Sequence, residues 1–372
     1  MPTIRLFTSE SVCAGHPDKI CDAISDTILD EILRQDPHGR AGIEAVAGAD
    51  QISLFGEIKT SAQLDLEKIV RSEMTRQGYT VPAWGFSDTE SAFSNYLHQQ
   101  SPEISQGVDA DGAGDQGMMF GYACTETPEL MPLPITLAHS LTRRIDEVRT
   151  SKILDYIRPD GKAQVTIRYE DDKPVAVEKV VVAVAHSEDV DPQTVHAGVV
   201  KEIITPVLER YHLATPDDTN ITVNGTGLWH IPGPESDAGL TGRKIVVDGY
   251  GGYARVGGGA FSGKDPSKVD RSGAYAARYI AKNIVAAGLA AKCEVGLAYV
   301  IGRPEPLMQT IDTFGTATVP EKELYAFKDK LIDTSVKGII ETLNLRRPIY
   351  AQTAAYGHFG KDGLPWERIA GV

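Results

Sequence analysis

The chain has 372 residues, more than one compact domain usually holds, and 42% hydrophobic and 24% charged residues, as in globular proteins. Its formal net charge of −14 argues against general nucleic-acid binding, which needs a basic surface. No apolar run approaches the ~18 residues of a membrane span, the N-terminus lacks a signal-peptide core, and the cysteines form no Cys-x-x-Cys pair. We therefore expect a cytoplasmic protein of two or three domains that contacts neither membrane nor nucleic acid.

Three stretches of the chain repeat one order of elements, namely two strands and then a helix. They span 43–75, 164–204 and 293–333. Within them, strands are expected at 43–47, 51–58, 164–169, 174–185, 293–301 and 308–314, and helices at 65–74, 193–204 and from 321 onward. The units begin about 120–130 residues apart, which suits triplicated domains and is too far for a solenoid repeat.

This alternation of β-rich runs and amphipathic helices predicts the α+β class, with sheets covered on one face by helices. Further helices are expected over 18–33, 137–150 and 272–287. The repeats predict domains at 1–101, 112–230 and 231–372, with segments that can interleave in space.

The first expected helix carries two stripes at the same spacing. One is apolar and consists of Ile20, Ile24, Ile28 and Ile32. The other is acidic and consists of Asp18, Asp22, Asp26 and Asp30. Because a buried row of carboxylates is costly, we expect all but Asp18 on a solvated face.

The most informative stretch is 257–271, which reads Gly-Gly-Gly-Ala-Phe-Ser-Gly-Lys-Asp-Pro-Ser-Lys-Val-Asp-Arg. Its glycines let the backbone approach an anion closely and turn N–H groups toward it. Charged side chains follow: Lys264, Lys268 and Arg271 are basic, and Asp265 and Asp270 can hold a hard cation. Glycine, cation and carboxylate together are what a polyphosphate with Mg²⁺ requires.

Two other interpretations of this stretch stay open on the residues alone. Gly258 to Lys264 fits the Gly-x-x-x-x-Gly-Lys part of a P-loop, but Asp265 stands where Ser or Thr is needed. The best expected strand, 245–248, also lies about ten residues upstream rather than directly before the loop. A flexible glycine loop is the second alternative, although such loops do not usually carry this charge pattern.

Four further places carry candidate chemistry, each with a plainer structural alternative. His16, Asp18 and Lys19 open the first helix, where they can bind phosphate or simply cap the helix. The run 112–117, Gly-Ala-Gly-Asp-Gln-Gly, suits a ligand or a turn. Arg243 and Lys244 precede an expected strand, where they can grip phosphate or form surface pairs, and Trp229 can stack on a ligand or pack in the core.

Taken together, these residues resemble the S-adenosylmethionine synthetase (methionine adenosyltransferase) family. The resemblance covers nearly the whole chain, from 7–12, Phe-Thr-Ser-Glu-Ser-Val, to 353–360, Thr-Ala-Ala-Tyr-Gly-His-Phe-Gly. The runs 112–117 and 257–270 are its most specific motifs. The family fold implied is three similar α+β domains around a pseudo-threefold axis, in a homodimer or homotetramer whose active sites two subunits share.

The reaction implied by the resemblance joins L-methionine to ATP. The methionine sulfur attacks ribose C5′ and displaces triphosphate, which is then hydrolysed to pyrophosphate and phosphate. No covalent enzyme intermediate is needed, so catalysis rests on alignment and on stabilising the departing charge. The implied cofactors are two Mg²⁺ and one K⁺ per site.

The resemblance also assigns residues to roles. The catalytic residues implied are His16, Lys162, Arg243 and Lys264. ATP would contact these and Asp160, Leu228, Trp229, Asp237, Lys244 and Ala260. Methionine would contact Glu57, Gln100, Asp115, Asp237 and Lys268. Asp18 and Asp270 would bind Mg²⁺, and Glu44 would bind K⁺.

Some positions depart from the family pattern. Leu228 replaces an expected Arg, Ala14 an acidic residue and Gly225 a Pro, and the loop between Asp109 and Gly112 is short. Two other functions therefore stay in view: a hydrolase of ATP or triphosphate with the same fold, and a non-catalytic regulatory subunit. The regulatory subunit is disfavoured because the residues implied for catalysis and metal binding are present, namely His16, Asp18, Lys162, Lys264 and Asp270.

Overall fold

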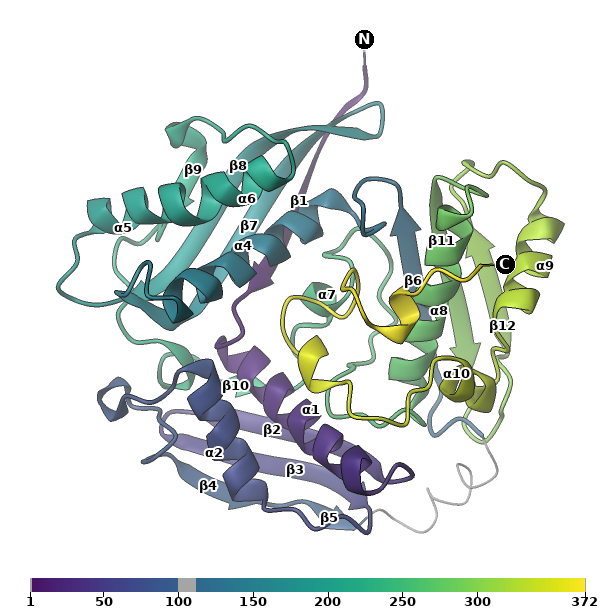
Figure 1. Cartoon of the computed structure of the whole chain (residues 1–372), viewed down its shortest axis with the longest axis horizontal. Helices are drawn as coiled ribbons and strands as arrows, with labels where there is room; N and C mark the ends of the chain where they lie inside the picture. Colours follow the sequence, from purple (N-terminus) through teal and green to yellow (C-terminus); the bar gives the residue numbers. More distant parts are fainter. Residues whose placement is uncertain (1, 100–111, 372) are drawn as a thin grey trace.

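The computed structural model describes residues 2–99 and 112–371. The predicted methionine residue Gln100 and the short loop that ends at Gly112 lie outside the described residues. Within the described ranges, three sheet-and-helix units surround the centre of the molecule (Figure 1). No helix in them is long and apolar enough to cross a membrane.

The first sheet has the strand order β10-β2-β3-β4, with β5 also paired to β3. Its strands are β2 (Arg40–Gly48), β3 (Gln51–Lys59), β4 (Ala92–Asn95), β5 (His98–Gln99) and β10 (Gly239–Leu240). Helices α1 (Pro17–Gln35) and α2 (Leu66–Gln77) cover one face of it (Figure 1). The predicted isoleucine stripe of α1 is confirmed, since all four side chains are fully buried in the core.

The second sheet has the order β1-β7-β8-β9. Its strands are β1 (Ile4–Val12), β7 (Ile157–Glu170), β8 (Lys173–His186) and β9 (Ile221–Val223). The covering helices are α4 (Leu133–Thr150), α5 (Pro192–Val199) and α6 (Thr205–Arg210), and a π-helical turn at Val200–Ile204 joins the last two. These elements enclose a separate hydrophobic core.

The third sheet has the order β12-β11-β6. Its strands are β6 (Gly117–Cys124), β11 (Lys292–Tyr299) and β12 (Met308–Asp312). The helices α8 (Val269–Ala286), α9 (Glu321–Leu331) and α10 (Val336–Thr342) belong to this unit, and α8 packs closely on β6 and β11. The α+β class is therefore confirmed.

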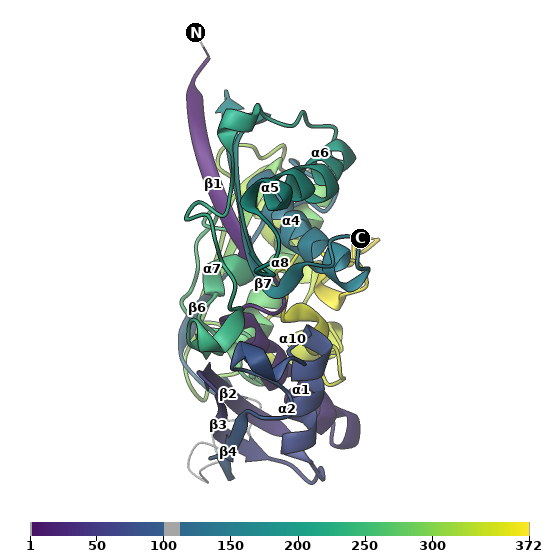
Figure 2. The same cartoon turned by 90° about the vertical axis from the view of Figure 1, so that its left-hand side faces the viewer.

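The sheets draw strands from distant parts of the chain. Strand β1 joins β7, β10 joins β2, and β6 joins β11. The sequence pattern does not predict β1 or β6. The domain boundaries 1–101, 112–230 and 231–372 stay predictions. In the side view the strands lie toward one side of the molecule and most helices toward the other (Figure 2).

Two expectations are wrong. The stretch 245–248 is not a strand but the short helix α7 (Ile245–Asp248), whose Asp248 is buried and binds Lys19. The aspartates of α1 do not face solvent, because Asp22 and Asp26 are fully buried and Asp30 is 8% exposed. Each is bonded to groups from distant segments, which offsets part of the cost of burial, although burial still raises the pKa of Asp22 to about 7 and that of Asp30 to about 6.

Candidate active site

The start of α1 fixes the histidine that the sequence singles out. His16 is the N-cap, Pro17 occupies the first turn, and the backbone N–H of Asp18 donates to Nδ1 of His16 at 3.1 Å. Burial, with the positive charges of Lys244 and Lys162, lowers the pKa of His16 to about 3. The ring is therefore neutral, and its proton lies on Nε2 because Nδ1 accepts a hydrogen bond.

Asp18 lies beside two basic side chains. Its Oδ2 is 2.5 Å from Nζ of Lys244, and its Oδ1 accepts the backbone N–H of Leu240 at 3.0 Å. Nε of Arg243 lies 3.6 Å from Oδ1. Burial raises the pKa of Asp18, but these hydrogen bonds outweigh it, so the pKa lies below its ordinary value. The carboxylate is thus kept ionised.

The glycine-rich loop places a second lysine–carboxylate pair. Nζ of Lys264 lies 2.7 Å from Oδ2 of Asp270, in the first turn of α8. A Cβ at Gly259 would lie 2.2 Å from Cγ of Asp270, so a larger residue there would displace the Asp270 side chain. Nζ of Lys268 donates to the carbonyl of Ala41 at 3.0 Å and lies 4.0 Å from the Glu57 carboxylate.

The sequence suggests that Asp265 and Arg271 contact a ligand, but in the structure both bind other parts of the chain instead. Asp265 is buried and accepts the backbone N–H groups of Ala41 and Ser267, so it holds the loop on β2. Arg271 is fully buried, and both of its terminal nitrogens bind Asp26. The P-loop interpretation also fails, because within the described residues the element directly before the loop is the helix α7 and not a strand.

The two basic loops, which we define as 239–244 and 257–268, lie side by side. A Cβ at Gly242 would lie 2.5 Å from Cβ of Ala260. Lys264 forms an isolated β-bridge with Gly42 of β2. The structure thus brings together eight of the predicted residues: His16, Asp18, Arg243, Lys244, Ala260, Lys264, Lys268 and Asp270. This site cluster combines four basic side chains with two carboxylates.

Strand β7 supplies two further predicted residues. Asp160 is 3% exposed, and its Oδ2 accepts the backbone N–H of Gly233 at 3.0 Å. Its Oδ1 is buried without a hydrogen-bond partner in the described part of the chain, and burial raises the pKa of Asp160 to about 7. Lys162, exposed on the same strand, contributes to the lowered pKa of His16.

The remaining predicted residues are less closely tied to the site cluster. Leu228 is 57% exposed, and the indole N–H of the half-buried Trp229 donates to the Ile231 carbonyl. Over residues 2–99 and 112–371, no hydrogen bond or ion pair links the side chains of three exposed acids to the cluster: Glu44, Asp115 and Asp237. Their roles stay predictions.

Sequence reasoning does not find the buried ion pairs behind the site cluster. Lys19 is fully buried and binds both Asp22, at 2.8 Å, and Asp248. The single positive charge of Lys19 thus faces two carboxylates, from α1 and α7, which are distant in sequence. The four-residue spacing of the aspartates is the only hint of these ion pairs in the sequence. It shows that the carboxylates share one face of α1, but not that distant cations and N–H groups bury that face.

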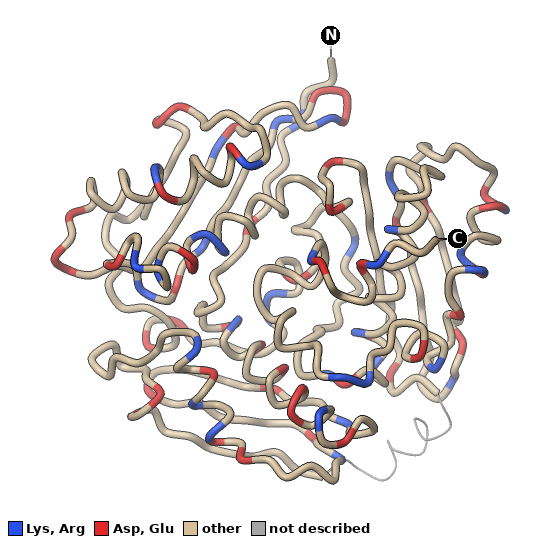
Figure 3. Tube along the Cα trace, viewed as in Figure 1, with Lys and Arg blue, Asp and Glu red and all other residues tan. Residues whose placement is uncertain are grey.

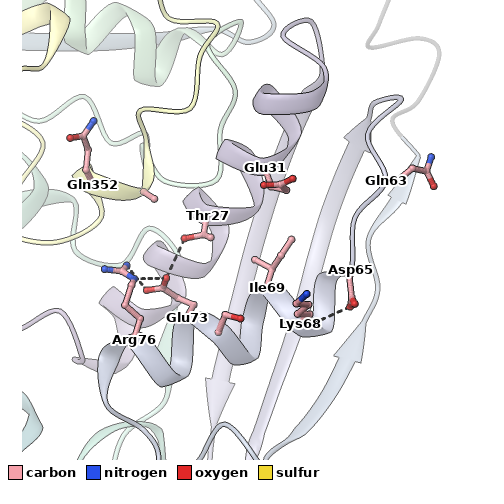
Figure 4. A pocket seen from close by; sticks show the side chains of 11 residues that line it. Thr27, Glu31, Gln63, Asp65, Lys68, Ile69, Glu73, Arg76 and Gln352 are labelled. Atoms are coloured by element: carbon pink, nitrogen blue, oxygen red, sulfur yellow. Dashed lines mark hydrogen bonds and ion pairs between the residues drawn. The ribbon is translucent and has the colours of Figure 1, made fainter.

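A pocket of about 700 Å³ lies away from the site cluster. It lies between α1 and α2 beside residues 351–352, where Thr27 of α1 donates to Glu73 of α2 and Arg76, also on α2, binds the same carboxylate (Figure 4). None of the predicted site residues lines it. Acidic and basic residues are interspersed along the chain (Figure 3), and the fold brings Arg243 and Lys244 of one basic loop beside the loop that carries Lys264 and Lys268.

Comparison with known proteins gives a consistent result. Family models described as the N-terminal, central and C-terminal domains of S-adenosylmethionine synthetase match residues 4–102, 110–229 and 231–368. S-adenosylmethionine synthases of two strains of Staphylococcus epidermidis are 51% identical over 383 aligned positions, covering 98% of this chain and 96% of each relative. The chain therefore belongs to the S-adenosylmethionine synthetase family.

Proposed function

We propose that the site cluster is the active site at which this chain makes S-adenosylmethionine from L-methionine and ATP. Family membership and the named relatives support synthesis of S-adenosylmethionine and do not favour the hydrolase alternative. The observation that carries the proposal is the meeting of two basic loops at the start of α1. This arrangement suits a polyphosphate whose charge grows as its bond to the ribose breaks.

The basic side chains would hold the triphosphate. Arg243 can donate two hydrogen bonds from a planar fork, and Lys244 and Lys264 add point charges. Both lysines already face carboxylates, at 2.5 Å and 2.7 Å, so their positions are set before substrate arrives. Preorganised charge of this kind lowers the barrier because it needs no rearrangement during the reaction.

His16 would donate from Nε2 to the oxygen that leaves ribose C5′. The ring is neutral and oriented by the Asp18 N–H, so it can stabilise developing negative charge without being a cation itself. Lys162 would contact the ATP oxygens and Trp229 would lie against adenine with Leu228 nearby. Glu57, Asp115, Asp160, Asp237 and Lys268 would contact methionine or ribose.

The carboxylates of the site cluster fit Mg²⁺. Asp18 and Asp270 are oxygen donors, each already beside a cationic group. Mg²⁺ commonly binds one or two carboxylates together with substrate phosphates, and the described residues contain no cage of three or more acidic, histidine or cysteine side chains. Bound Mg²⁺ would neutralise triphosphate charge, with Asp18 and Asp270 as its protein ligands. Two Mg²⁺, and one K⁺ at Glu44, are the proposed complement.

We further propose a homodimer or homotetramer with shared active sites. Large apolar side chains are exposed on strands of the sheet layer, among them Leu6 at 56%, Phe55 at 42% and Met118 at 52%. Helices cover the opposite face of the sheets (Figure 2). Exposed apolar patches of this kind mark interaction surfaces. A cytoplasmic location remains part of the proposal.

Incubation of the protein with ATP, L-methionine, Mg²⁺ and K⁺, followed by chromatography, tests the proposed function. We expect S-adenosylmethionine, pyrophosphate and phosphate in equal amounts. A second incubation without methionine measures hydrolysis alone. Phosphate release without any S-adenosylmethionine would support the hydrolase, and no turnover of either kind would support a regulatory subunit.

A further inference from the structure

Three carboxylates at four-residue intervals on α1 hold the two basic loops by their backbones. The bonds run from the N–H of Leu240 to Asp18 at 3.0 Å, of Gly242 to Asp22 at 2.8 Å and of Gly263 to Asp26 at 2.9 Å. Four residues of α-helix advance about 6 Å, so the intervals on α1 correspond to fixed spacings between the loop peptides. The helix α1 thus fixes the positions of both basic loops relative to each other.

Asp26 holds the loop around Lys264 from both sides. Its carboxylate accepts the N–H of Gly263 and forms two bonds of 2.7 Å with Arg271. Nη1 of Arg271 in turn donates to the carbonyl of Lys264 at 3.0 Å. The peptide groups before and after the Lys264 side chain are therefore fixed by one fully buried ion pair.

Asp22 does the same for the loop that carries Arg243. It accepts the N–H of Gly242, the residue directly before Arg243, while Lys19 donates to its other oxygen at 2.8 Å. Gly242 has φ +80° and lies against Ala260 of the other loop. A shift at Gly242 would therefore move Arg243 and disturb the contact between the two loops.

We propose that Asp22 and Asp26 are positioning residues, which set the spacing of the two basic loops for a triphosphate-sized anion. The proposal rests on the proposed function. Neither side chain is accessible, since both are fully buried, so each acts only through the loop peptides and cations that it binds. Replacement of a whole buried ion pair by apolar residues is often neutral for stability, so stability alone does not account for these carboxylates, and positioning is the role that we assign to them.

Asp30 provides a matched control on the same face of α1. It is buried and accepts two backbone N–H groups at 2.9 Å, from Tyr350 and Ala351. Those residues belong to neither basic loop. Loss of Asp30 therefore removes a buried carboxylate and its backbone bonds without freeing a ligand-gripping loop.

The test compares Asp22→Ala with Asp30→Ala in the full chain. Lys19 keeps its bond to Asp248 in the first variant, so a buried cation is not left unpaired. The probe is diimidotriphosphate with Mg²⁺, whose P–N bonds resist hydrolysis, titrated by calorimetry. We expect Kd to rise on the order of 10-fold in Asp22→Ala and to stay near the wild-type value in Asp30→Ala. Equal Kd values in the two variants would overturn the proposal.

A double variant tests Asp26 without leaving Arg271 unpaired. Asp26→Ala combined with Arg271→Met removes both charges and both backbone bonds around Lys264. We expect a Kd increase on the order of 10-fold or more, with a lower kcat and little change in methionine KM. Wild-type Kd in this folded variant would contradict a positioning role. If the wild-type protein itself binds no diimidotriphosphate, the proposed function fails, independently of the roles of Asp22 and Asp26.

Discussion

Asp18 donates its backbone N–H to Nδ1 of His16 at 3.1 Å, so a predicted Mg²⁺ ligand orients the histidine predicted to lie at the breaking bond. The bond leaves Nε2 as the donor of a neutral ring. The side chain of Asp18 meanwhile faces Lys244 and Arg243. In the proposed reaction His16 would act on the leaving oxygen, whereas the side chain of Asp18 faces the cationic groups.

Replacing His16 by Asn should separate the two reactions of the site. Asn can still cap α1, but it cannot place a donor where Nε2 lies. We expect S-adenosylmethionine formation to fall by about 10²-fold or more, as for loss of an oxyanion donor, while hydrolysis of added triphosphate falls less. Product analysis of both reactions checks this, with the exposed His38→Asn as control. Equal loss of both activities in a folded variant would exclude the division.

Asp18→Asn should change the Mg²⁺ requirement. The carboxamide of Asn keeps an oxygen that accepts the Leu240 N–H, but it lacks the negative charge that would bind Mg²⁺. Outer-shell changes typically weaken metal binding 10–100-fold, so loss of a direct ligand should raise the Mg²⁺ concentration for half-maximal rate by at least about 10-fold. Rates measured over a Mg²⁺ series decide this, with Asp30→Asn as control. An unchanged Mg²⁺ dependence would show that Asp18 is not a ligand.

Asp160 should make stability depend on pH. Burial raises its pKa to about 7, above the unfolded value near 4. Between about pH 4 and 7 the folded state holds the extra proton, so this group's contribution falls by about 1.4 kcal/mol per pH unit as pH rises. It is complete below about pH 4 and lost above about pH 7.

Asp160→Asn should remove this dependence. Relative to wild type, the free energy of unfolding of the variant should rise between about pH 4 and 7 and then level off. Urea denaturation of both proteins at matched pH values measures the difference. A difference that stays constant through that window would show that Asp160 is ionised in the folded state as in the unfolded chain.

The acidic stripe of α1 shows what sequence alone cannot settle. The apolar stripe is predictable because isoleucines at helical spacing need only a sheet to cover them. The fate of Asp22 and Asp26 depends on Gly242 and Arg271, more than 200 positions away, so from the sequence the cost of burial looks prohibitive. Because the partner of Arg271, Asp26, is equally distant in the sequence, Arg271 looks unpaired from the sequence and is taken for a ligand-binding group.

Local propensity explains the other failures. Ile245 to Val247 are β-branched and favour a strand, yet a tertiary ion pair between Asp248 and Lys19 accompanies a single helical turn there. Strand β1 is not predicted because its partner β7 is distant in the chain. By contrast, Lys264 and Asp270 are close in sequence, and their 2.7 Å contact agrees with the glycine-rich motif.

The sheet layer should form a subunit interface. Phe55→Asp and Met118→Asp place charges on exposed apolar positions of β3 and β6, and we expect them to shift the protein toward monomers. An obligate interface on the order of 2,000 Å² or more would not tolerate buried unpaired charges. Sedimentation at assay concentration measures the state. Ile153→Asp, at a 49% exposed position after α4, is the control. A fully active monomeric wild type would rule out shared active sites.

The rate of S-adenosylmethionine formation by Lys264→Ala tests the central claim most directly. The claim is that the two basic loops hold the triphosphate, and Lys264 is the residue of the glycine-rich loop that contacts Asp270 of α8. We predict a fall in kcat on the order of 10²-fold or more, with wild-type folding. Lys322→Ala, on the exposed side of α9, should keep the wild-type rate. A wild-type kcat for Lys264→Ala would contradict the account.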